Sequence, residues 1–142
     1  MWTVEHSIDT RSEPEAIWRA WVNVERWPEW NADIEQIELP GPFGVGSTIA
    51  MTPHGQETIE LRVAAVVKGE QFVDEAEVAG TVIRTTHRVD PLPDGDGARI
   101  VYRLEASGPE AEEIGPAVSA DFPETLAALA EHVTRLTAPA SR

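Results

Sequence analysis

The chain has 142 residues, the size of one domain, and its hydrophobic fraction of 42% is ordinary for a globular protein. Its 25 acidic residues against 11 basic ones give a formal charge of −14, which argues against nucleic acid and anionic membranes as partners, because both attract basic surfaces. Cysteine is absent, which excludes disulfides, thiolate metal sites and a cysteine nucleophile. No segment resembles a secretory signal or a membrane span of about 20 apolar residues, so we expect a cytoplasmic protein.

The first part of the chain predicts one strand followed by two short helices. Residues 2–9 alternate between apolar and polar side chains, which is the period of a half-buried strand, and His6 falls on the apolar face. Ser12 and Glu15 fit a capping box at the start of a short helix. A second short helix is expected to end near Trp27.

A corner built on two tryptophans marks the change from helix to sheet. Pro28 disfavours continued helix at Trp27, and Trp30 follows two residues later. Each indole can bury roughly 200 Å² of mostly apolar surface, so we expect the corner to be anchored. Packing alone and the lining of a ligand pocket explain Trp27 and Trp30 about equally well.

Six further strands with short connections are predicted in the middle of the chain. They are expected over residues 34–39, 47–52, 59–67, 71–79, 81–89 and 98–107. Because the connections are short, neighbouring strands should pair antiparallel as a meander.

The last part of the chain is predicted to be helical. An acidic segment after residue 108 is expected to break at Gly115 and Pro116, and Asp121 can then cap a long helix with one apolar stripe. We assign residues 1–137 to a single domain and residues 138–142 to a frayed tail. One strand, two short helices, six strands and a long helix make an α+β order, in which a curved antiparallel sheet can wrap the terminal helix.

Three local motifs add a family resemblance. They are Ser12-Glu13-Pro14-Glu15-Ala16-Ile17-Trp18, then Trp27-Pro28-Glu29-Trp30, then Gly41-Pro42 with Gly44-Val45-Gly46 before a strand. With these motifs and the long terminal helix, the chain resembles the START/Bet v 1-like (SRPBCC) superfamily, in particular its polyketide cyclase/dehydrase and lipid-transport branch. The resemblance implies a helix-grip fold, with about seven strands around the terminal helix and an apolar cavity. Members bind lipids, hormones or polyketides, and some catalyse ring closure, but no catalytic motif carries over residue by residue.

Polar side chains with inward parity are the candidates for chemistry in such a cavity. His6 and His87 could act as general acid or base, and Tyr102 could donate to a developing enolate. Polar side chains that only orient a ligand are the alternative interpretation. The expected ligand-binding wall comprises Trp27, Trp30, Phe43, Met51, Leu61, Val63, Ile83, Thr85, Phe122 and Leu126.

Metal and cofactor sites are not predicted. The four histidines are scattered, with none at a metal-binding spacing, and we expect His54 and His132 to be exposed. No cofactor is expected.

Three functions remain open at this point. The leading hypothesis is the binding of a small hydrophobic ligand, such as a lipid, polyketide or aromatic metabolite, in an internal cavity. The alternative is a cofactor-independent cyclase, aromatase or dehydratase that uses cavity histidine and tyrosine, and the third is a protein-interaction module. The expected partner is a small apolar molecule, and the strand edges would also allow a homodimer.

Overall fold

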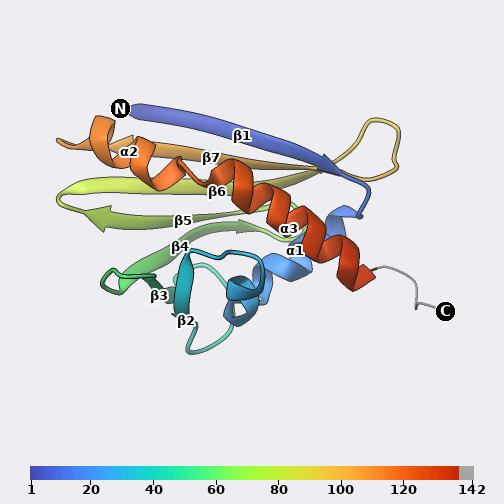
Figure 1. Ribbon diagram of the computed structural model, residues 1–142, viewed down its shortest axis with the longest axis horizontal. Coiled ribbons are helices and arrows are strands. Elements are labelled where there is room, and N and C mark those ends of the chain that lie inside the picture. Colours follow the sequence, from blue (N-terminus) through green and yellow to red (C-terminus); the bar gives the residue numbers. More distant parts are fainter. Residues whose placement is uncertain (138–142) are drawn as a thin grey trace.

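Over residues 1–137, which the computed structural model describes, seven strands form one antiparallel sheet that curves along the C-terminal helix (Figure 1). The strands are β1 (Trp2–Thr10), β2 (Ile34–Glu38), β3 (Thr48–Pro53), β4 (Ile59–Val67), β5 (Gln71–Val78), β6 (Thr81–Pro91) and β7 (Ala98–Ser107). Their order in the sheet is β1-β7-β6-β5-β4-β3-β2, so β2 to β7 form a meander and β1 pairs with β7. The predicted α+β class and helix-grip fold are confirmed. The predicted tail, 138–142, lies outside the described residues.

The helices cover one face and one end of this sheet. They are α1 (Pro14–Val22), the 3-10 helix η1 (Val24–Glu29), α2 (Ala111–Ser119) and α3 (Phe122–Thr137). Helix α3 runs across the sheet, while α1 and η1 lie toward its C-terminal end (Figure 1). The two short helices after the first strand are confirmed, but the predicted end near Trp27 is wrong, because η1 continues through Pro28 to Glu29.

The predicted capping box at Ser12 does not form. Helix α1 begins at Pro14, with Glu13 at the N-cap and no side-chain cap hydrogen bond. The Ser12 side chain is buried, and its hydroxyl lies 3.4 Å from the hydroxyl of Thr134 on α3. A contact between distant parts of the chain thus replaces the local cap.

The predicted break at Gly115 and Pro116 is also wrong, because both residues lie inside α2. Gly115 packs against the indole of Trp2, so closely that a Cβ atom would overlap the ring. Docking of α2 on β1 therefore outweighs the low helix propensity of glycine and proline.

His54 and His132, both predicted to be exposed, differ in their exposure to solvent. His54 is exposed, as predicted, but His132 is only 7% exposed, so the prediction for it is wrong. Its Nε2 atom lies 4.0 Å from the carboxylate of Glu29 on η1. The 3-10 helix thus reaches the side of α3 that the apolar stripe alone would leave to solvent.

Candidate ligand-binding site

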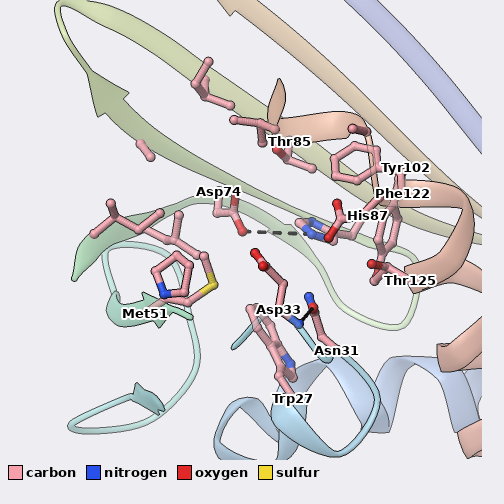
Figure 2. Close-up of a pocket in the computed structure, with 18 of the residues that line it drawn as sticks. Trp27, Asn31, Asp33, Met51, Asp74, Thr85, His87, Tyr102, Phe122 and Thr125 are labelled. Carbon is pink, nitrogen blue, oxygen red and sulfur yellow. Dashed lines mark hydrogen bonds and ion pairs between the residues drawn. The ribbon is translucent and has the colours of Figure 1, made fainter. Parts of the chain in front are cut away.

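A cavity of about 460 Å³ lies between the sheet, η1 and the helices α2 and α3. Its wall combines apolar and aromatic side chains with polar ones, three of them aspartates, and Figure 2 shows several of the polar side chains pointing into the same space. The cavity occupies only part of the concave side of the sheet. Buried aliphatic and aromatic side chains of the hydrophobic core fill the remainder.

Seven of the ten predicted ligand-binding residues line this cavity, namely Trp27, Trp30, Met51, Leu61, Ile83, Thr85 and Phe122. The other three belong to the core instead. Val63 and Leu126 are buried away from the cavity, and the Phe43 ring packs edge-on against Phe72 at 5.2 Å between centroids. Strand parity finds the inward face, but it does not show where on that face space is left open.

The three predicted acid–base candidates lie in one row across neighbouring strands. Tyr102 on β7 is paired in register with His6 on β1 and with His87 on β6. The His87 and Tyr102 rings are 4.8 Å apart between centroids, and both line the cavity. His6 does not line it, because its ring packs at 6.3 Å against Phe122, which itself forms part of the wall. The structure therefore brings two of the three together and leaves His6 behind helix α3.

Two tryptophans hold the tyrosine in place through a chain of hydrogen bonds. The Trp27 indole donates to the backbone carbonyl of Trp21 at 3.0 Å, and the Trp21 indole donates to the Tyr102 hydroxyl at 3.2 Å. Trp21 itself is fully buried. Burial also raises the pKa of Tyr102, so its hydroxyl stays protonated and can donate to a ligand.

The His87 ring is packed in the cavity wall and is uncharged at neutral pH. It stacks on Phe72 with 4.0 Å between centroids and an interplanar angle of 3°. Burial lowers the pKa of His87 to about 3, against a smaller opposing effect of the Phe72 backbone. No group in the described chain makes a hydrogen bond of ordinary geometry to its buried Nδ1 atom. At neutral pH this imidazole is an acceptor or a neutral donor, and it has no proton to release as an acid.

Asp74 on β5 is one of several polar cavity residues that the sequence analysis did not predict, and Asp33 and Asp121 are others. Its side chain is 5% exposed, and its Oδ2 atom faces His87 Nε2 at 4.0 Å, beyond hydrogen-bond reach (Figure 2). Burial, with a smaller contribution from the charge of Glu75, raises the pKa of Asp74 to about 7. The signal was available in the sequence, because Asp74 lies midway between Phe72 and Ala76 on the strand and shares their parity. Of the two side chains, the Asp74 carboxyl therefore has the pKa nearer to neutrality.

Within residues 1–137, no three histidine, aspartate or glutamate side chains gather as a metal site. No helix in that part of the chain is long and apolar enough to span a bilayer.

Fold and cavity together define a START-like helix-grip protein. The sequence model of the family described as polyketide cyclase/dehydrase and lipid transport matches residues 1–134, so the chain belongs to that family. No curated protein sequence matches it.

Solved structures share the fold at low sequence identity. A protein from Mesorhizobium loti has a TM-score of 0.79 and 16% identity, with 97% of this chain and 100% of that chain covered. A START superfamily protein from Mycobacterium smegmatis has a TM-score of 0.74 and 19% identity, covering 95% and 99%. Norcoclaurine synthase from Thalictrum, a point mutant in complex with a transition-state analogue, has a TM-score of 0.78 and 16% identity, covering 96% and 96%. At these identities the similarity establishes the fold alone.

Proposed function

We propose that this protein binds a small, mainly apolar molecule inside the cavity between the sheet and helix α3. The observation that carries the proposal is the cavity itself, whose volume of about 460 Å³ falls within the range of roughly 300–1,000 Å³ typical of small-molecule sites. Trp27, Trp30 and Tyr102 supply aromatic surface, and the few polar groups can fix the orientation of a ligand. Family membership supports the same function.

The test is direct binding of a neutral aromatic probe, 2-ethylnaphthalene, by calorimetry and by amide chemical-shift changes. We expect saturable binding to one site, with shifts at cavity residues such as Ile83. Replacing Ala76, a small residue in the wall, by phenylalanine should fill the cavity and weaken binding at least about tenfold. Val82→Phe on the outer face of the next strand is the matched control and should leave binding unchanged. Absence of binding, or binding that Ala76→Phe does not weaken, would refute the proposal.

A cofactor-independent cyclase, aromatase or dehydratase is the second candidate, and one observation favours it. Asp74, with its pKa raised to about 7, faces the same space as the neutral His87 and the protonated Tyr102. In this version Asp74 moves the proton, Tyr102 donates a hydrogen bond to the developing enolate, and His87 orients the substrate. Norcoclaurine synthase shows that the fold can carry a catalyst.

Dehydration of an aromatic β-hydroxyketone tests this second candidate. Asp74→Asn should lower the rate at least about 100-fold, since positioned acid–base groups contribute 10²–10⁴-fold. Equal rates with and without the carboxyl would exclude Asp74 from proton transfer.

The exposed apolar side chains give little support to the third hypothesis, a protein-interaction module. Large apolar side chains that are exposed within residues 1–137 lie on separate elements, for example Val67 on β4, Val82 on β6 and Leu136 on α3. The homodimer and the cytoplasmic location both stay predictions.

A further inference from the structure

We propose that the cavity selects ligands that carry a protonated amine on an apolar ring system, and that Asp74 binds the amine. This inference rests on the proposed function and names the chemical class of its ligand. Three observations support it. The Asp74 carboxyl is buried without a partner, the described cavity wall holds no lysine or arginine, and the gap between Asp74 and His87 fits one ammonium group.

The first observation concerns the carboxyl of Asp74. The side chain is only 5% exposed and points into the cavity (Figure 2), yet no donor within residues 1–137 makes a hydrogen bond to it. Buried polar groups are almost always hydrogen-bonded, because leaving a carboxylate desolvated and unpaired is costly. A missing partner that arrives with the ligand accounts for this arrangement.

The second observation concerns the sign of the charges around the cavity. Asp33, Asp74 and Asp121 all line it, while no lysine or arginine of the described chain does. The pKa of Asp121 is raised first by burial and next by the charge of Asp33. The nearest arginines on neighbouring strands, Arg62 and Arg84, are both bound to Glu75 on the other face of β5. An anionic ligand would meet repulsion throughout the cavity, whereas a cation would be attracted.

The third observation concerns the geometry of the gap. Asp74 Oδ2 and His87 Nε2 are 4.0 Å apart, so a nitrogen about 2.8 Å from each atom can bridge them. An ammonium group has three donors, and a neutral imidazole with its proton on Nδ1 leaves Nε2 as an acceptor. The hydroxyl of Thr85, on the same strand as His87, also lines the cavity and offers a further acceptor. One amine can thus donate to Asp74, to His87 Nε2 and to Thr85 at the same time, while the buried Nδ1 atom of His87 stays outside this contact.

Three probes of similar shape test this selectivity: 2-(2-naphthyl)ethylamine, 2-ethylnaphthalene and 2-naphthylacetate. At pH 8 we expect the amine to bind at least about tenfold more tightly than the neutral probe, a difference of about 1.4 kcal/mol. The acetate should bind more weakly than the neutral probe. Asp74→Asn should remove the preference for the amine over 2-ethylnaphthalene. Glu75→Gln, the adjacent carboxyl on the outer face, is the matched control and should keep the preference for the amine at pH 8, where Asp74 is ionised with or without the charge of Glu75.

The dependence on pH gives a second readout. Affinity for the amine should rise between pH 5.5 and pH 8 as Asp74 ionises, and the rise should be absent in Asp74→Asn. The charged and titratable groups around Asp74 are His87 from β6, Tyr102 from β7, Asp33 before β2, Asp121 before α3 and the adjacent Glu75. The pKa of His87 is lowered to about 3 and that of Tyr102 is raised, so neither titrates in this interval.

The possible failures are distinguishable. If 2-ethylnaphthalene binds and the amine shows no preference, or the preference survives Asp74→Asn, this inference is refuted and the proposed function stands. If none of the three probes binds, the proposed function fails and this inference fails with it.

Discussion

Asp74 and Glu75 are neighbours on β5, yet the two carboxyl groups lie in opposite environments. Glu75 is bound by Arg62 at 2.7 Å and also by Arg84, which come from the strands on either side. Within residues 1–137, Asp74 on the cavity side faces the uncharged His87 at 4.0 Å and forms no ion pair with an arginine or lysine. Arginine side chains therefore lie beside this part of β5, but on the outer face of the sheet. The difference supports the proposal that the inner carboxyl is left for a ligand, while the outer one pairs with arginines of the protein itself.

The largest expected effect comes from removing the aromatic support of the inner face. Trp21→Ala deletes a fully buried side chain that contacts Phe72, His87 and Tyr102, and it should lower the free energy of unfolding by about 3–5 kcal/mol. Urea denaturation measures this. Arg84→Ala on the outer face should cost about 1 kcal/mol or less, since exposed ion pairs contribute little. Equal losses would contradict the contrast between the two faces.

The next effect concerns Asp74 and pH. The pKa of Asp74 is raised from 3.8 to about 7 in the folded state, so between these values the folded state holds a proton that the unfolded chain has released. Wild-type stability therefore falls as pH rises through this window. Relative to wild type, Asp74→Asn should gain stability between pH 4.5 and pH 8, by up to about 4 kcal/mol.

Urea denaturation of both proteins across that pH range checks the prediction. His87 has the opposite dependence, because its lowered pKa costs stability as pH falls below 6.5, but this contribution cancels in the difference between the two proteins. A difference that does not change with pH would show that the Asp74 carboxyl is solvated or paired.

A smaller effect is expected at the helix that closes the inner face near β1. Gly115→Ala adds a Cβ atom where α2 packs on the Trp2 ring, and the resulting shift should cost about 1–3 kcal/mol. Because α2 contributes Ala117 and Val118 to the cavity wall, binding of 2-ethylnaphthalene should weaken as well. Thermal unfolding and calorimetry measure the two changes. Gly44→Ala, where a Cβ atom meets open space, is the control, and a similar loss in both variants would refute the packing argument.

The smallest effect should come from the outer carboxylate. Glu75→Gln weakens the two cross-strand ion pairs, and we expect the free energy of unfolding to change by no more than about 1 kcal/mol, with less difference at high salt. Denaturation at two salt concentrations measures this. A loss comparable to that of Trp21→Ala would mean that these pairs hold the sheet together.

The fold could be predicted from the sequence because it is encoded in local patterns. Period-two alternation identified the strands, short connections identified the meander, and the apolar stripe identified α3. The errors came where contacts between distant segments override local preferences. Gly115 continues a helix because it packs on Trp2, and His132 is buried because η1 approaches it.

The site could be predicted less completely. Parity placed His87 and Tyr102 on the correct face, but it placed His6 there too and could not show that Phe122 separates His6 from the cavity. Burial also changes which group has a pKa near neutrality. It lowers the pKa of His87 to about 3 and raises the pKa of Asp74 to about 7. Such shifts depend on the whole surroundings of a group, which strand periodicity does not describe.

The most direct test of this account is a pH titration of the Asp74 side-chain carboxyl by ¹³C NMR, with the resonance assigned by its loss in Asp74→Asn. We expect a midpoint near pH 7 in the free protein, because the group is buried without a partner. Saturation with 2-(2-naphthyl)ethylamine should lower that midpoint, because the bound cation favours the ionised form. A midpoint near the ordinary value of 3.8, unchanged by the amine, would contradict both the unpaired carboxyl and its role in binding.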